Sequence, residues 1–484
     1  MRSMFNPMES SPRDLSAPDE GANRGGDTRE RCGTPATATG RPRLQWVEPS
    51  VWTERMLTAL EKGVKGGKWF SLIDKVWSPA NLLASFAKVK TNRGAAGIDR
   101  VTVDAFETRL EKNLARLERA LREQTYRPQP VRRTYIPKPG SKEKRPLGIP
   151  TVRDRVAQGA VRHVLEPIFE RDFAEHSYGF RPGRGCKDAL RRVDALLRRG
   201  YTWVVDADIK SYFDTIPHDR LMARVGEKVS DGRVLELIGA YLKQGILDGL
   251  KYWTPEEGTP QGAVLSPLLA NLYLDPFDHH MAGLGFEMIR YADDFVILCR
   301  NEADARRALD LAGRWMDENG LRLHPEKTRI VDALVFKGGF DFLGYHFECG
   351  MRRDRLTGQR GPGWMRWPRK KSLKKFKDAI RAKTHRANGH SLDTIIVRVN
   401  YTTRGWYGFF KHSARNVFER LDSWIRERLR RILWRRRGHR RMGHDWMHRC
   451  WSNDFFAGLG LFSMADRHLA DLAAWDLAGR PRSG

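Results

Sequence analysis

The chain has 484 residues, of which 40% are hydrophobic and 30% charged, and its 87 Lys and Arg against 59 Asp and Glu give a formal net charge of +28 and a pI near 10.2. This length accommodates two to four domains with hydrophobic cores, and such a positive charge indicates a polyanionic partner such as a nucleic acid. No run of about 18 apolar residues occurs, which excludes a spanning helix, and five cysteines without a Cys-x-x-Cys pair are typical of unpaired thiols in a reducing cytosol.

The N-terminal part of the chain changes character near residue 45. The first 45 residues are rich in Ser, Pro, Gly, Thr and Arg and lack hydrophobic periodicity, so we expect them to be disordered. They contain no apolar segment of the kind found in secretory signals. Residues 46–125 are predicted to be mostly helical. The Gly-rich segment 63–68 is a residue short of a P-loop and is followed by Trp69 instead of Ser or Thr, so we expect it to contact RNA.

Residues 203–214 have the apolar pattern of a core strand, interrupted by acidic residues. Side chains alternate along a strand, so Asp206 and Asp208 lie on one face. Periodicity alone does not choose between them as functional carboxylates.

A second acidic position lies in the segment Tyr-Ala-Asp-Asp, which ends with Asp293 and Asp294. Short strands are predicted on both sides, over 286–290 and 295–299, which places the acidic pair at the tip of a hairpin. Adjacent carboxylates repel each other, and their burial is costly unless a cation compensates the charge. Mg²⁺ suits such oxygen ligands and shares its remaining positions with water and substrate phosphates. An isolated Asp-Asp pair is more typical of a solvated turn, so a third carboxylate is needed to support a metal site.

Most of the positive charge lies in residues 366–441, which hold 24 Lys and Arg against 5 Asp and Glu, a net of +19. Apolar residues recur at helical intervals from Val417 to Leu433, which predicts a helix that docks on a core. Its opposite face carries Arg420, Arg426, Arg430 and Arg437. Aromatic residues lie among the basic ones, at Trp364, Trp367, Trp406, Tyr407, Phe409 and Phe410. For these rings core packing is favoured over stacking on bases, and the basic face is predicted to bind nucleic acid.

Four residues of metal-ligating types lie close together near the C-terminus, at His439, His444, His448 and Cys450. His444 and His448 have the i, i+4 spacing of a zinc pair. A basic RNA-contacting loop with a terminal helix beyond it is favoured over a metal site, which remains the alternative.

Taken in chain order, the central motifs resemble the palm of a reverse transcriptase. They are Asp208-Ile-Lys-x-x-Phe213-Asp214, Thr259-Pro-Gln-Gly262 with Leu265-Ser-Pro267, and Tyr291-Ala-Asp-Asp294. Further segments resemble group II intron reverse transcriptases: Asn92–Asp99, Tyr135–Pro139, Lys144–Pro150, Tyr178–Gly183, Gly320–Thr328, Phe340–Tyr345 and Arg404–Tyr407. The resemblance covers roughly residues 50–460.

This resemblance implies an α+β fold, a right-hand polymerase whose fingers and palm combine an antiparallel sheet with helices and are followed by an α-helical thumb or maturase domain. The expected divisions are 1–45 as a disordered extension, 46–200 as N-terminal extension and fingers, 201–350 as palm, 351–437 as thumb, and 438–484 as a short DNA-binding region. Only 34 residues follow Cys450, so we expect no endonuclease domain, as in the group IIC subclass.

The resemblance also assigns roles to individual residues. Catalytic carboxylates are Asp208, Asp293 and Asp294, which with the main-chain carbonyl of Ile209 are expected to hold two Mg²⁺ ions. The expected dNTP-binding residues are Lys138, Arg145, Phe213 and Gln261, with the Phe213 ring excluding a ribose 2′-hydroxyl. Primer and template contacts are expected from Tyr291, Lys327 and Arg181, and RNA contacts from Arg404, Arg426, Arg430 and Arg437. By contrast, Asp206, Asp214 and Asp275 are expected to be structural.

The function implied is RNA-directed DNA synthesis coupled to splicing and mobility of a group II intron. The expected partners are the intron RNA, an RNA template with a DNA primer, a single-stranded or stem-loop DNA target and dNTPs, in the bacterial cytoplasm and without a membrane. The alternatives are a retron-type or diversity-generating reverse transcriptase, which usually has a shorter thumb, and a splicing-only maturase with a vestigial polymerase. An RNA-directed RNA polymerase would more typically show Gly-Asp-Asp and a polar residue at position 213.

Overall fold

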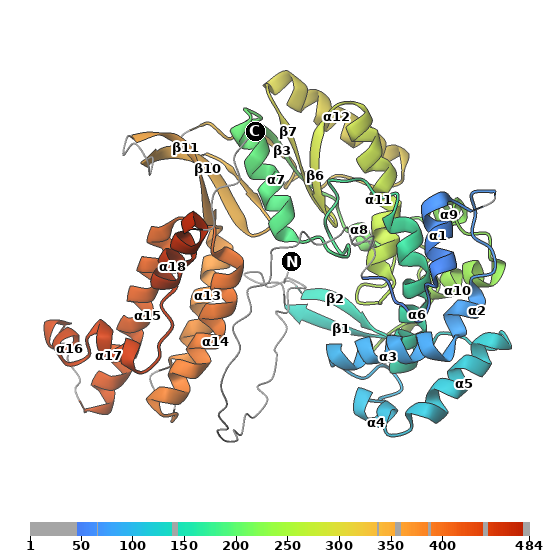
Figure 1. Cartoon of the computed structure of the whole chain (residues 1–484), viewed down its shortest axis with the longest axis horizontal. Coiled ribbons are helices and arrows are strands. Elements are labelled where there is room, and N and C mark those ends of the chain that lie inside the picture. The colour runs from blue at the N-terminus through green and yellow to red at the C-terminus, as the bar shows by residue number, and fades with distance from the viewer. Residues whose placement is uncertain are drawn as a thin grey trace, which may run out of the picture.

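The computed structural model describes residues 46–64, 66–137, 144–335, 338–353, 360–385, 389–438 and 444–477. Figure 1 shows three regions, with a strand-rich palm at the top, the fingers at the lower right and the thumb helices at the lower left. The expected disordered segment 1–45, Lys138 and His439 lie outside the described residues.

The N-terminal extension and fingers combine a helical layer with a small sheet. The helices are α1 (Glu54–Lys62), α2 (Ile73–Trp77), α3 (Pro79–Asn92), α4 (Val103–Glu107), α5 (Leu110–Arg122), α6 (Val152–Glu170) and α7 (Cys186–Arg198). The strands are β1 (Val131–Pro137), β2 (Lys144–Ile149), β4 (Ile246–Asp248) and β5 (Lys251–Trp253), in the order β2-β1-β4-β5. Because β1 and β4 run parallel, this sheet is mixed, whereas an antiparallel one was expected. The helical prediction for residues 46–125 is confirmed.

The palm is built on an antiparallel sheet in the order β6-β7-β3-β8. Its strands are β3 (Trp203–Asp208), β6 (Glu287–Tyr291), β7 (Asp294–Cys299) and β8 (Arg329–Asp332). Its helices are α8 (Tyr212–Thr215), α9 (His218–Gly226), α10 (Gly232–Leu242), α11 (Ser266–Gly283) and α12 (Glu302–Glu318). Both strands predicted around the acidic pair are present. The inner strands β3 and β7 carry fully buried Val, Ile and Phe side chains, which anchor the sheet between α11, α12 and α7.

The thumb begins with strands and continues as helices. A three-stranded sheet in the order β11-β10-β9 joins it to the palm, with β9 (Phe340–Phe342), β10 (Tyr345–Arg353) and β11 (Arg360–Pro368). The helices are α13 (Lys370–Lys383), α14 (Leu392–Phe410), α15 (Arg415–Arg436), α16 (His444–Cys450), α17 (Asn453–Gly458) and α18 (Met464–Leu477). An all-helical region was expected from residue 351, but helix starts only at Lys370 because Arg360–Pro368 pairs along its length with Tyr345–Arg353.

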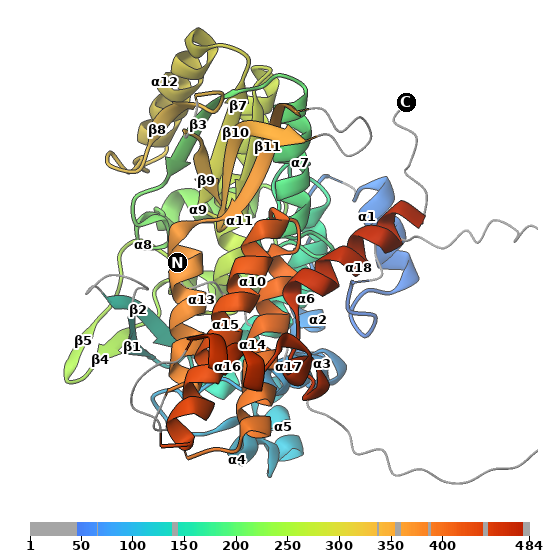
Figure 2. The same cartoon turned by 90° about the vertical axis from the view of Figure 1, so that its left-hand side faces the viewer.

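The thumb has a hydrophobic core of its own. Figure 2 shows α13, α14 and α15 running side by side, with α16–α18 against them. The apolar stripe predicted for α15 faces this core, and Tyr407 and Phe410 are buried, so core packing is confirmed for these two rings. Within the described residues, no helix is long and apolar enough to cross a membrane.

Candidate active site and nucleic-acid interface

Three carboxylates meet at one edge of the palm sheet. Asp208 ends β3, Asp294 begins β7, and the two residues face each other as cross-strand partners. Asp293 stands in the two-residue turn between β6 and β7, after Ala292, whose φ is +60°. Pairing of this hairpin with β3 therefore brings together Asp208 and Asp293, which lie 85 residues apart in the sequence, as the motifs predict.

The electrostatics of this edge are unfavourable for negative charge. Burial, with a further contribution from Asp208, raises the pKa of Asp293 to about 6. Burial and then the neighbouring Asp293 raise the pKa of Asp294 well above its usual range. Among the described residues, the buried Oδ1 of Asp293 has no hydrogen-bond partner. A hard divalent cation would supply the missing partner and offset the repulsion, so the donor set fits Mg²⁺.

The carboxylates do not form a closed cage. No group of three or more His, Cys, Asp or Glu side chains in the described part of the chain stands ready to enclose a metal ion. The exposed Lys327 ammonium instead pairs with Oδ2 of Asp208. Mutual repulsion keeps acidic side chains apart, and Mg²⁺ takes several of its ligands from water and substrate phosphates. A Mg²⁺ ion at this edge would therefore also need ligands from water or substrate.

Two other palm carboxylates, Asp206 and Asp275, have partners within the fold. Asp206 Oδ2 accepts a hydrogen bond at 3.1 Å from Nε of Arg329 on β8 and forms a salt bridge with Nη2 of the same residue at 3.1 Å, so the Asp206 charge is paired within the sheet. Asp275 likewise accepts from the main-chain N–H of Ala174 at 2.9 Å. These bonds agree with the structural roles predicted for both. Ile209 follows Asp208 and is buried.

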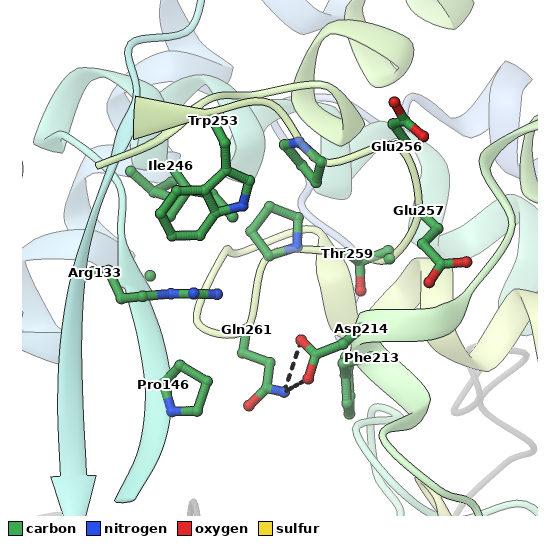
Figure 3. A pocket seen from close by; sticks show the side chains of 15 residues that line it. Arg133, Pro146, Phe213, Asp214, Ile246, Trp253, Glu256, Glu257, Thr259 and Gln261 are labelled. Atoms are coloured by element: carbon green, nitrogen blue, oxygen red, sulfur yellow. Dashed lines mark hydrogen bonds between the residues drawn. The ribbon is translucent and has the colours of Figure 1, made fainter. Parts of the chain in front are cut away.

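A cavity of about 230 Å³ lies between the fingers sheet and the loop before α11 (Figure 3). Phe213 and Gln261 line it, as does Arg133, whose guanidinium lies 4.7 Å from the centre of the Trp253 ring. Gln261 Nε2 donates to both carboxylate oxygens of Asp214, at 3.0 and 3.1 Å. This pairing holds the Gln261 amide at the cavity wall, a role for Asp214 that the sequence did not predict.

Arg145 on β2 connects this cavity with the acidic edge. Burial raises the pKa of both Asp214 and Asp293, and the positive charge of Arg145 partly offsets each rise. The guanidinium is therefore close enough to influence both carboxylates.

Arg181 does not have the exposure expected of a primer or template contact. Its side chain is buried and donates to Glu170 and to the main-chain carbonyls of Ala174 and Ser177. The expectation is wrong for this residue, because the guanidinium organises the loop after α6. Tyr291 is the last residue of β6, directly before the Ala292–Asp293 turn, and its ring centroid lies 6.4 Å from that of Phe180.

Arg430 was expected on the exposed face of α15 and is instead 2% exposed. It donates to the Trp451 carbonyl at 2.8 Å and to Asn453 Oδ1 at 3.0 Å, because α16 and α17 cover this part of α15. The prediction that Arg430 contacts RNA is therefore wrong. Arg404 and Arg437 are exposed as expected, and Arg426 is half-buried.

One basic and aromatic cluster in the thumb was missed. The Trp424 ring has three cationic groups 5.4–5.8 Å from its centroid, from Lys377 and Arg381 on α13 and Arg428 on α15. The Lys-rich amphipathic pattern of α13 is the sequence feature from which this cluster could have been predicted. The cluster adds positive charge to the face between these helices.

His444, His448 and Cys450 lie on a helix and not in the expected loop, since α16 spans His444–Cys450. His448 Nε2 is 3.7 Å from Glu427 Oε2. Neither His448 nor Cys450 belongs to a metal-binding group within the described residues.

Comparison with known proteins agrees with this arrangement. The family described as reverse transcriptase (RNA-dependent DNA polymerase) matches residues 136–347, and the group II intron, maturase-specific domain matches residues 373–451. The group II intron-encoded protein LtrA of Lactococcus lactis subsp. cremoris is 41% identical over 208 residues, which are 43% of this chain and 34% of LtrA. The chain thus spans about a third of the length of LtrA.

Two further relatives extend the comparison. An uncharacterized 91 kDa protein in the cob intron of Schizosaccharomyces pombe is 38% identical over 207 residues, covering 42% of this chain and 25% of that protein. Protein YkfC of Escherichia coli (strain K12) is 35% identical over 306 residues, covering 54% of this chain and 79% of YkfC. With both domains present and most of YkfC matched, the chain belongs to the family of group II intron-encoded reverse transcriptases.

Proposed function

We propose that this protein is an RNA-directed DNA polymerase that binds a group II intron RNA, assists its splicing and copies it into cDNA. The observation that carries the proposal is the meeting of Asp208, Asp293 and Asp294 at a sheet edge beside the cavity lined by Phe213 and Gln261. Acidic residues serve metal-assisted nucleotidyl transfer, and a neighbouring cavity of mixed polarity suits a nucleotide.

Asp208, Asp293 and Asp294 would hold two Mg²⁺ ions, whose charge would supply activation of a primer 3′-hydroxyl and stabilisation of the triphosphate. Arg145 contributes a planar guanidinium suited to bidentate phosphate binding. Gln261, which Asp214 holds at the cavity wall, would border the base and sugar, and Phe213 would close the side where a 2′-hydroxyl lies. Lys327 would leave Asp208 and turn to the primer terminus once substrate is present.

The thumb supplies the affinity for RNA in this proposal. Its exposed arginines and the cluster around Trp424 neutralise phosphates, and this sequence-independent term dominates the affinity of basic proteins for nucleic acids. We further propose an RNA template with a DNA primer and a single-stranded or stem-loop DNA target as partners, in the bacterial cytoplasm.

The test separates catalysis from RNA binding. Asp293→Asn removes one negative charge from the buried acidic edge, so we expect primer extension on an RNA template to be abolished. Affinity for intron RNA should stay within about threefold of the original, because the thumb carries the binding. Filter binding and primer extension on the same preparation measure both.

Asp275→Asn is a matched control, since Asp275 is also a partly buried palm carboxylate but serves the main chain at Ala174. It should extend primers at a rate close to the original. Retained extension by Asp293→Asn would refute the catalytic assignment.

A further inference from the structure

Arg290 lies on β6 of the acidic hairpin, two residues before Ala292, and its side chain is buried. Its side chain is 1% exposed, so it cannot reach substrate. Nε donates to Asp278 Oδ1 at 2.7 Å, and Nη2 donates to the other oxygen of the same carboxylate. This bidentate pair uses two of the three guanidinium nitrogens and fixes the plane of the group against α11.

The third nitrogen is used at the turn itself. Nη1 of Arg290 donates to the main-chain carbonyl of Ala292 at 2.9 Å and to Asn271 Oδ1 at 3.1 Å. Ala292 has a φ of +60°, a left-handed conformation that residues with a Cβ adopt only when the surroundings hold them there. Asp293 follows directly, so the conformation of the Ala292 peptide sets the direction in which the Asp293 side chain extends from the main chain.

The same network holds the segment that packs on the turn. Asn271 Nδ2 donates to the Gly179 carbonyl at 2.7 Å, while the main chain of Arg290 is bonded to His176 and Tyr178 at 3.0 and 2.9 Å. A Cβ added at Gly179 would lie 2.3 Å from the main-chain nitrogen of Ala292. Asn271 thus fixes the tight contact between the two segments. It lies two helical turns from Asp278 on α11, so one helix face carries both partners of Arg290.

We propose that Arg290, Asn271 and Asp278 are positioning residues that hold the Ala292 turn in the conformation required for metal binding by Asp293 and Asp294. An ion pair that only stabilised the fold would need no partner for Arg290 beyond Asp278. The hydrogen bond from Nη1 of Arg290 to the Ala292 carbonyl is the feature that links this ion pair to the acidic edge. The inference rests on the proposed function, because it concerns the geometry of that same acidic edge.

The test uses Arg290→Lys and Asn271→Ala in the full-length protein. Lysine keeps the charge beside Asp278 but has no planar fork to reach Ala292 as well, and Asn271→Ala loosens the network without burying an unpaired charge. We expect each variant to lower kcat for primer extension by tenfold or more, with KM for dNTP within about twofold, since the cavity residues are untouched. Mn²⁺ binding to the RNA-free protein, followed by electron paramagnetic resonance, should weaken by about the same factor.

Arg155→Lys is the matched control, because Arg155 is also buried and also donates to a main-chain carbonyl, that of Ala95, far from the turn. It should lower the melting temperature yet leave Mn²⁺ binding and kcat unchanged. Folded Arg290→Lys and Asn271→Ala proteins with unaltered Mn²⁺ affinity and kcat would overturn the inference, as would equal losses in Arg155→Lys. Failure of the unsubstituted protein to extend primers or bind Mn²⁺ would instead refute the proposed function.

Discussion

Phe213 is held at the cavity by its neighbour in the sequence. The buried Tyr212 donates its hydroxyl proton to the Ala270 carbonyl, and its ring lies edge-on to Phe213 with centroids 5.5 Å apart. The position of the Phe213 ring is therefore set by a side chain that is itself anchored to α11. A fixed ring at a cavity wall can exclude a substituent by size alone.

Shortening this ring should change sugar selectivity. With Phe213→Val we expect incorporation of ribonucleotides relative to deoxynucleotides to rise by about tenfold or more, with deoxynucleotide use largely retained. Single-nucleotide extension assays with dNTP and rNTP measure the ratio. Phe213→Tyr keeps an aromatic ring at the same place and should leave selectivity unchanged; the same unchanged ratio in Phe213→Val would show that another residue is the gate.

At the scale of elements, α15 shows how arginines on one helix divide between two tasks. Arg420 and Arg437 are exposed, whereas Arg430 is enclosed by α16 and α17. An exposed guanidinium can neutralise a phosphate, while a buried one that satisfies main-chain carbonyls stabilises the fold.

This division is testable through the salt dependence of RNA binding. Replacing the exposed Arg404, Arg420 and Arg437 together by Gln should reduce the slope of log affinity against log salt by about 2 to 3 units, from roughly 0.7 to 0.9 per phosphate contact. The control, Arg430→Gln, should lower the melting temperature and leave the slope unchanged. A triple variant with the original slope would place those arginines outside the RNA interface.

For the whole molecule, the joint between palm and thumb is the sheet β9–β11 and the aromatic residues on it. Tyr345 on β10 is 1% exposed, contacts the rings of Phe409 and Phe410 on α14, and donates its hydroxyl proton to the Phe409 carbonyl at 2.7 Å. Its neighbour Gly344 accepts from the main-chain N–H of Arg369 at the start of α13. The start of α13 and the end of α14 are therefore tied to this sheet at Gly344 and Tyr345.

Removing the Tyr345 hydroxyl should affect processivity more than chemistry. Tyr345→Phe loses one buried hydrogen bond, worth about 1 kcal/mol, which corresponds to a factor of about five in holding the thumb against the palm. We expect shorter cDNA per binding event in a trap assay and an unchanged rate for the first nucleotide. In Tyr407→Phe the lost bond, to Asp471, lies within the thumb, and cDNA length should not change.

Much of the site was predictable because local sequence determines it. Apolar runs on both sides of 291–294 predict a hairpin, and the order of the motifs identifies the palm, so Asp208, Asp293 and Asp294 could be named before their meeting was seen. The apolar stripe of α15 likewise follows from a period of 3.6 residues, which depends only on which residues are apolar. These features depend on residues that lie close together in the sequence.

Tertiary structure decided what each polar side chain does. Arg181 and Arg430 are of a residue type that often contacts nucleic acids, but both are internal donors, because the loop after α6 encloses Arg181 and α16 and α17 cover Arg430. The Asp206 carboxylate, on the same face as Asp208, is engaged by Arg329 from β8, more than a hundred residues away. The β10–β11 pair, the parallel β1–β4 pairing and the clamp of Arg290 on Ala292 also depend on long-range contacts. The sequence by itself therefore determined the family, the acidic edge and the helical faces. Burial and pairing of individual charges depend on what lies next to them in space, and only the folded chain decides that.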